Sequence, residues 1–266
     1  MRQHRARPHR HVIAAACLAL AATAGLTACG SEDGKAAGAA KRAAGKTGAA
    51  KDPFAGMSGG EIADKAVEAT SKAASLRMKG AVTDAEEGRI SLDMALDTTG
   101  TCAGTMGMNG QGSIELIIPG DTVYMKYDEK FLRAQSKGEP ASDVQAAVDM
   151  LADRWAKTKA TSSDAKEIAG FCDLDTVLAD FKDVHSAARR GGATTVDGVP
   201  AIKLTESDGK EKYELYVATE GKPYLLRVDT LTKGGTPETL SFGDYDKPVK
   251  ATPPTGDILD LDKLAS

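Results

Sequence analysis

Apolar and polar side chains alternate along much of this chain. The stretch Gly88–Asp97 (GRISLDMALD) is the most regular, with Ile90, Leu92, Met94 and Leu96 on one side of an extended backbone. Alternation with a period of two predicts a strand with one buried face. For function, the question is whether this apolar side fills an ordinary core or lines a space that holds a ligand.

Further strands are predicted on both sides of this one. Before residue 130 they are LRMKGAV, CAGTMGM, SIELII and TVYMKY, and after residue 192 they are TTVDGVPAIKLT, EKYELYVA, YLLRVDTL and ETLSFGDY. Short turns that contain Gly or Asp join these runs, which is typical of an antiparallel meander with one apolar and one polar face.

Three segments have helical spacing instead. They are Gly60–Ser75, a segment that begins with a capping box of Ser142 and Gln145, and Leu174–Phe181. The apolar face of the second consists of Val144, Val148, Leu151 and Trp155. The order helix, strands, helices, strands predicts an α+β fold, in which a single large curved antiparallel sheet carries the helices on its apolar side.

Residues 1–28 have the features of a signal peptide. Four arginines precede Val12–Leu26, an uncharged run of 15 residues, whereas a membrane-spanning helix needs about 20 apolar residues. The signal ends in Leu26–Cys29 (LTAC), which resembles a bacterial lipobox. It predicts that Cys29 carries a diacylglyceryl group and anchors the protein on the outer face of the cytoplasmic membrane. The alternative is an ordinary secretory signal with a chance cysteine.

Residues 29–56 consist mostly of Ala, Gly and Lys, with no large apolar residue before Phe54. Such a composition cannot bury enough apolar surface to offset the entropy of the chain. We therefore expect a flexible tether with a reach of roughly 30 Å. The globular domain is expected at residues 57–266.

The charge of the mature chain excludes one class of function. Loss of residues 1–28 removes four arginines and no acid, which leaves 30 basic and 38 acidic residues and a net charge of −8. A protein that binds nucleic acid needs a basic face to neutralise phosphates. We expect no nucleic-acid partner.

Catalytic motifs are weak in this sequence. The stretch Gly56–Gly60 matches the G-x-S-x-G motif of serine hydrolases, but no strand precedes it, and Ser58 with Glu61 forms a capping box instead. The motif Gly45–Thr47 (GKT) lacks the first glycine of a phosphate-binding loop, and His185 is the sole histidine of the mature chain. We expect no enzyme, no metal and no cofactor.

The cysteines allow one disulfide in the mature domain. Cys17 leaves with the signal and Cys29 is acylated, so Cys102 and Cys172 remain in an oxidising compartment. A bond between them would close a loop of about 70 residues and stabilise the fold by roughly 4 kcal/mol in the chain-entropy view. The alternative is two buried free thiols.

Several features together resemble a known family. They are the lipobox, the tether, the helix before a strand meander, Asp153–Thr158 (DRWAKT) and the segment SFGDYDKPVKATPP near the end. In these features the chain resembles the actinobacterial LppX/LprAFG lipoproteins, relatives of the LolA-type carriers, over nearly the whole domain. The resemblance implies an incomplete β-barrel with helices packed on its concave face. It also implies a pocket there for the acyl chains of lipids or lipoglycans moved across the cell envelope.

The ligand-binding residues are predicted from the alternation, because the family has no catalytic residues to carry over. Methionine suits adaptable apolar surfaces, and Gly80 and Gly104 leave bulk missing on the same side. We predict that ligand contacts come from Met78, Ile90, Leu92, Met94, Leu96, Met106, Met108, Ile114, Leu116 and Ile118. The alternative is that these side chains form an ordinary core.

The resulting hypothesis is a monomeric lipid-binding lipoprotein, with a lipid or lipoglycan as cargo and a membrane exporter as a further partner. Other classes of function remain. They are an envelope interaction or stress-sensing module of the same fold that binds a polypeptide, a surface structural protein, and a serine hydrolase. Lipid that purifies with the protein would separate the first hypothesis from the others.

Overall fold

The computed structural model describes residues 52–84, 88–178 and 187–264. By its internal contacts the chain divides into two units, residues 1–49 and 50–266, and the described residues all belong to the second. The signal peptide, Cys29 and His185 lie outside the described residues. None of the described helices is long and apolar enough to cross a membrane.

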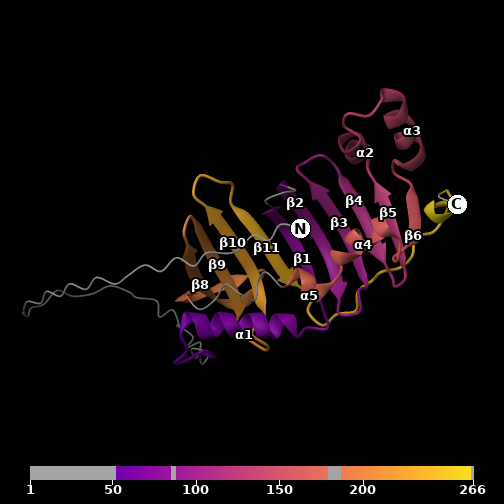
Figure 1. Ribbon diagram of the computed structural model, residues 1–266. Helices are drawn as coiled ribbons and strands as arrows, with labels where there is room; N and C mark the ends of the chain where they lie inside the picture. The colour runs from indigo at the N-terminus through magenta and orange to yellow at the C-terminus, as the bar shows by residue number, and fades with distance from the viewer. Residues whose placement is uncertain (1–51, 85–87, 179–186, 265–266) are drawn as a thin grey trace, which may run out of the picture. The chain divides into compact units, whose positions relative to one another are not determined.

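The second unit is built on one twelve-stranded sheet (Figure 1). Its strands on the N-terminal side are β1 (Ser75–Asp84), β2 (Gly88–Asp97), β3 (Cys102–Met108), β4 (Ser113–Ile118), β5 (Thr122–Tyr127) and β6 (Trp155–Lys159). The later strands are β7 (Arg189–Val196), β8 (Val199–Asp208), β9 (Glu211–Ala218), β10 (Leu225–Thr232), β11 (Glu238–Gly243) and β12 (Ile258–Asp260). The alternation therefore located nearly every long strand.

The two predicted groups of strands join through β1 and β11, which pair antiparallel with Met78 opposite Phe242. The order across the sheet is β12-β6-β5-β4-β3-β2-β1-β11-β10-β9-β8-β7, so β12 and β7 form the edges and the sheet does not close. The predicted single antiparallel sheet is confirmed. Its exception is the short β12, which runs parallel to β6.

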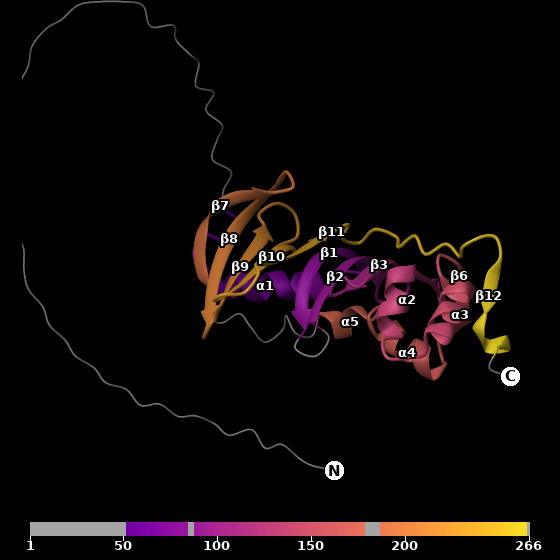
Figure 2. The same cartoon turned by 90° about the horizontal axis from the view of Figure 1, so that it is seen from above.

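The helices are spread along the concave side of the sheet (Figure 2). They are α1 (Gly59–Ser71), α2 (Glu129–Gln135), α3 (Ala141–Leu151), α4 (Ser163–Gly170) and α5 (Leu174–Val177), and the 3₁₀ turn η2 (Leu261–Lys263) follows β12. Helix α1 contacts β7 to β10. Its N-terminus has the predicted capping box, in which Ser58 Oγ accepts a hydrogen bond from the Glu61 N–H and Glu61 accepts one from the Ser58 N–H.

The prediction for the middle of the chain was partly wrong. Trp155 does not continue the second predicted helix, because Ala152 is extended and Asp153 has a φ of 56°, so the chain turns and Trp155 opens β6. The capping box of Ser142 and Gln145 is absent, since the N-cap of α3 is Pro140. Helices α2 and α4 were missed, and α5 ends at Val177.

The main core lies between the sheet and the helices and includes residues from both strand groups. Phe54, inside the predicted tether, is 4% exposed and packs in this core. Arg190 of β7 holds this segment. Its Nη1 donates hydrogen bonds to the backbone carbonyls of Phe54 (2.6 Å) and Met57 (3.4 Å), and its guanidinium pairs with Asp52.

Candidate functional site

The register of β1 to β4 brings the predicted ligand-binding residues together on the concave face. Met78 lies opposite Met94, Leu92 opposite Met106, and Met106 opposite Ile114. Directly paired residues of neighbouring antiparallel strands project to the same face of a sheet. That face is the concave one, because Met78 and Met94 belong to the core that the helices complete.

Half of this face is closed. A closed patch, which consists of Met78, Met94, Leu96, Leu116 and Ile118, is between 1% and 3% exposed. Ala165 of α4, Leu174 of α5 and Leu178 lie in the same core cluster and are equally buried. These five residues are therefore in the packed core, and ligand contact by them stays a prediction.

The other half is more open. An open patch, which consists of Leu92, Met106, Met108 and Ile114, is only half-buried. Leu92, Met106 and Ile114 pack against the edge of the main core. Ile90 lies opposite Met108 and is 8% exposed. The open patch thus offers apolar surface on the concave side that the protein itself does not fully cover.

Gly104 does not create the empty space that its lack of a side chain suggested. It lies opposite Met94, and a β-carbon added to Gly104 would come within 2.7 Å of the Met94 sulfur and would also meet the backbone carbonyl of Asp93. The neighbouring side chain and backbone therefore fill this position. The same holds at Gly80, where an added β-carbon would meet the backbone carbonyl of Thr239.

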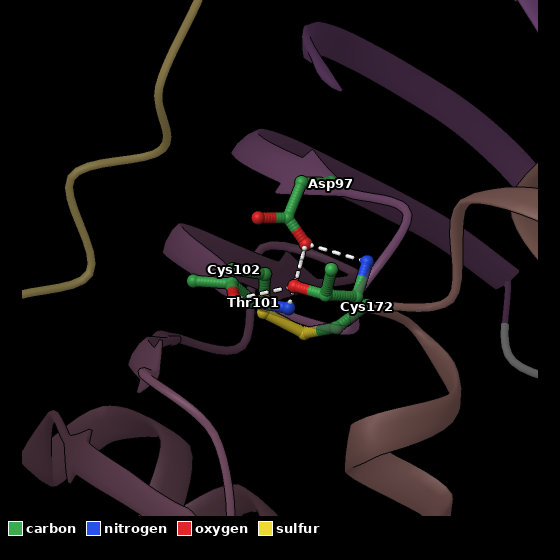
Figure 3. Close-up of a disulfide and its surroundings, with 5 residues drawn as sticks. Asp97, Thr101, Cys102 and Cys172 are labelled. Carbon is green, nitrogen blue, oxygen red and sulfur yellow. Dashed lines mark hydrogen bonds between the residues drawn. A yellow bond between two sulfur atoms is a disulfide. The ribbon is translucent and has the colours of Figure 1, made fainter. Parts of the chain in front are cut away.

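The predicted disulfide between Cys102 and Cys172 is present (Figure 3), and it lies at one end of the concave face. Cys102 begins β3 and Cys172 lies between α4 and α5, with their Cα atoms 5.6 Å apart and both side chains fully buried. Asp97 shapes the preceding turn, because its Oδ1 accepts hydrogen bonds from the N–H groups of Thr99 (2.8 Å) and Thr101 (3.0 Å). The bond therefore attaches the segment that covers the closed patch to the sheet.

Aromatic residues limit the open patch on the β5 side. Tyr127 lies opposite Ile114 and stacks on Phe131 of α2, with ring centroids 5.8 Å apart. The Tyr127 hydroxyl donates a hydrogen bond to the sulfur of Met125 at 3.1 Å. The sequence analysis did not name Tyr127 as a ligand contact. Its position two residues after Met125 in the alternating strand places it on the same face, and could have indicated this role.

Tyrosine and carboxylates occupy the concave face on the β8 and β9 side. Tyr213 packs against the main core, lies opposite the buried Glu206, and donates a hydrogen bond to Glu211. This hydrogen bond, burial, and the negative charges of Glu211, Asp208 and Glu206 raise the pKa of Tyr213 to about 12. The sequence analysis did not predict this group of Tyr213, Glu206 and Glu211. The apolar alternation of β8 and β9 predicts the core positions, but it does not indicate which polar side chains share the concave face.

The convex face of β1 to β5 is polar by contrast. Asp93 pairs with Arg77 at 2.6 Å and with Lys79 at 3.4 Å, and the hydrogen bond from Arg77 lowers the pKa of Asp93. Lys126 pairs with Glu115 at 2.6 Å and lies 4.9 Å from the ring centre of Trp155. Such a surface offers no apolar ligand a place to bind.

The weak catalytic motifs gain no support from the geometry. Ser58 caps α1 and its hydroxyl is bound to Glu61 at 2.8 Å, while no strand precedes it among residues 52–57. The motif at residues 45–47 lies outside the described residues. Within the part of the chain that the structure describes, no three His, Cys, Asp or Glu side chains are grouped so that they could hold a metal ion.

No protein family model and no curated protein matches this sequence, but solved structures do match. LprF from Mycobacterium bovis has a TM-score of 0.50 and 14% identity, over 74% of this chain and 97% of LprF. Lipoprotein LppX from Mycobacterium tuberculosis has a TM-score of 0.44 and 14% identity, over 72% and 97% of the two chains. A LolA superfamily protein from Nitrosomonas europaea has a TM-score of 0.23 and 10% identity, over 72% and 94% of the two chains.

The likeness to LprF concerns the fold alone, because the identity is only 14%. It confirms the fold that the sequence resemblance implied, an open, LprF-like sheet with helices on its concave face.

Proposed function

Starting from this LprF-like fold, we propose that the protein binds the acyl chains of a lipid or lipoglycan on its concave face and transports or presents them across the cell envelope. The observation that carries the proposal is the open patch, a half-buried apolar surface beside a closed core. The convex face of β1 to β5 is polar, so on these strands the concave side is the one on which an apolar ligand gains most from leaving water.

The energetics favour an acyl chain as the ligand. Removing apolar surface from water contributes about 25 cal/mol per Å², or roughly 0.8 kcal/mol for each buried methylene. Burial of ten methylenes therefore contributes roughly 8 kcal/mol, which offsets an association cost in the lower half of the estimated range of about 4 to 15 kcal/mol. About 19 buried methylenes, as two acyl chains supply, would offset the upper end. Half-buried Met106 and Met108 suit such a ligand, because unbranched methionine adapts to chains of different shape.

The proposed setting is the outer face of the cytoplasmic membrane, with a diacylglyceryl group on Cys29 as the anchor. A membrane exporter would then be a partner of the monomeric domain. Cys29→Ser tests this setting, because a serine cannot form the thioether. Metabolic labelling with an alkyne fatty acid should label the wild type and leave the variant unlabelled; persistent label on Cys29→Ser would overturn the anchoring.

Lipid content tests the binding function. Native mass spectrometry of protein purified from membranes of its own host should detect bound lipid on the wild type. Met106→Trp should lose that lipid, because the indole occupies part of the open patch. The matched control is Thr105→Trp, which adds the same ring at the next residue, on the exposed convex side of β3. Absence of lipid from the wild type, or equal loss in both variants, would contradict the proposal.

A further inference from the structure

The chain enters the domain beside β7, the outermost strand on one side of the sheet (Figure 2). Arg190 of β7 makes this junction. Its Nη1 donates hydrogen bonds to the backbone carbonyls of Phe54 and Met57, and its guanidinium pairs with Asp52. The side chain of Phe54 is buried in the main core, and α1, which follows, contacts β7. The point at which the N-terminal segment leaves the domain is therefore fixed at the β7 edge.

The two sides of this junction carry opposite charge. Residues 29–51 contain five basic and two acidic residues, a net charge of +3, whereas residues 52–266 contain 25 basic and 36 acidic residues, a net charge of −11. An anionic bilayer attracts a basic segment, by about fivefold in affinity for each Lys or Arg near its surface. The same bilayer repels carboxylates that come close to it. A domain that is anchored through residue 29 therefore turns its least acidic surface toward the bilayer.

The strand β7 is such a surface. Its sequence, Arg189–Val196 (RRGGATTV), contains two arginines and no acid, and the first carboxylate after it is that of Asp197 in the following turn. The seven residues from Arg189 to Thr195 are exposed. In the described sheet no further strand pairs with the outer edge of β7, so backbone groups along this edge are open to water and to lipid head groups.

A bilayer fits this edge better than a partner strand does. β7 contains a bulge, because three steps from Arg190 to Ala193 lie opposite two steps from Leu204 to Ile202 on β8. A bulge interrupts the regular spacing of the hydrogen-bonding groups and is one way in which proteins prevent strand addition at an edge. A fluid layer of head groups needs no regular spacing.

Resting on the proposed anchor at Cys29, we propose that the β7 edge is the surface with which the domain meets an anionic bilayer. Arg189 and the basic residues of 29–51 supply the attraction, and the Arg190 junction keeps β7 next to the anchored segment. The strand β6, near the opposite edge, lies ten strand spacings from β7 across the sheet. At about 4.8 Å each this is roughly 48 Å along the curved surface, so β6 stays free of the bilayer.

Quenching by a nitroxide lipid tests this orientation. The mature chain, residues 29–266, has one free thiol, since Cys102 and Cys172 form a disulfide, so Cys29 can be coupled to a maleimide lipid. The vesicles contain phosphatidylcholine, phosphatidylglycerol and a lipid with a nitroxide on its head group, which quenches a tryptophan that comes close. Thr194→Trp places an indole on β7. Thr161→Trp is the matched control, because it adds the same ring to the exposed turn after β6.

We expect stronger quenching of Thr194→Trp than of the wild type, whose sole tryptophan is Trp155 of β6. Thr161→Trp should be quenched no more than the wild type. Arg189→Glu, introduced into the Thr194→Trp chain, should lower the population in contact with the bilayer by about fivefold or more. Lys130→Glu makes the same change of charge on the exposed side of α2. It should have no effect, because salt screens a charge so far from the bilayer.

Equal quenching of Thr194→Trp and Thr161→Trp, or stronger quenching of the latter, would overturn the proposal. Equal effects of Arg189→Glu and Lys130→Glu would also overturn it, since net charge and not β7 would then set the contact. These outcomes would leave acyl-chain binding and the Cys29 anchor intact, because chemical coupling replaces the natural anchor in this experiment. Persistent fatty-acid label on Cys29→Ser in cells would instead remove the anchor, and the proposed orientation with it.

Discussion

The two ends of the concave face are built from the same strands but are held in different ways. At the closed end, Cys102 and Cys172 bond β3 to the segment between α4 and α5, and Leu96 and Ile118 are almost fully buried. At the open end, side chains of the same kind on the same strands stay half-buried. Met94 and Met106 show the contrast, since one is 3% exposed and the other belongs to the open patch.

A second set of contacts secures the closed end beside α1. The Ala74 N–H and the Tyr224 hydroxyl both donate to Asp246, at 2.9 and 2.6 Å, and Lys222 pairs with the same carboxylate at 2.9 Å. The Tyr245 ring stacks on Tyr224 with centroids 3.9 Å apart. These contacts give the segment GDYDKP a structural role. The disulfide and these contacts therefore both hold the closed end, whereas the proposed ligand would bind at the open end.

The largest effect is expected from the disulfide. Cys102→Ala/Cys172→Ala should lower the free energy of unfolding by roughly 4 kcal/mol, because the unfolded chain regains the freedom of a long loop. Urea denaturation of the variant and of the wild type, each with and without reductant, would measure this. Reductant should weaken the wild type alone. An unchanged urea midpoint in the variant would show that the closed end does not depend on the bond.

A tryptophan placed at each end should separate core from open surface. Met94→Trp overfills the closed patch and should cost about 1 to 3 kcal/mol of stability, whereas Met106→Trp should cost much less. Thermal denaturation of the two purified variants would compare them. Equal destabilisation would mean that the open patch is ordinary core, and it would remove the main support for the proposed function.

A smaller effect is expected at the start of α1, which covers the β7 to β10 side of the face. Ser58→Ala removes the N-cap and should cost about 1 kcal/mol. Ser58→Asp, which retains a capping oxygen but no hydroxyl, should keep most of the stability. Urea denaturation measures both. If the wild type has an esterase activity that both substitutions abolish, this result would instead support the serine hydrolase hypothesis.

The smallest effect is expected at Asp246, because its side chain is 38% exposed and solvent screens its interactions. The hydrogen bond from Tyr224 and those from Lys222 and Ala74 lower its pKa. Since the folded pKa lies below the unfolded value of about 3.9, the stabilisation is complete above that pH and is lost as the pH falls below it. Asp246→Asn should lower the thermal midpoint at pH 7 and converge with the wild type in acid. Equal midpoints of both proteins at pH 7 would contradict this.

Much of the fold could be predicted from local pattern. The bounds of β2, β3, β4 and β9 follow the predicted runs, because each run carries apolar residues at every second position and ends at a turn. Cys102 and Cys172 could be paired by elimination. The error at Trp155 arose because its spacing from Leu151 also fits a helix, and the left-handed turn at Asp153 between them leaves no periodic signal. The seven-residue α2 is too short to show one.

The sequence by itself determined which side of each strand is apolar, since alternation is a property of neighbouring residues. Only the tertiary structure decided how deeply each residue of that side lies. Met94 and Met106 are equivalent in the pattern, and their burial differs because α4, α5 and the disulfide cover one end of the sheet. The position of the polar group around Tyr213 on the same face as Ile90 likewise depends on the pairing of β1 with β11, a contact between segments that are distant in the sequence.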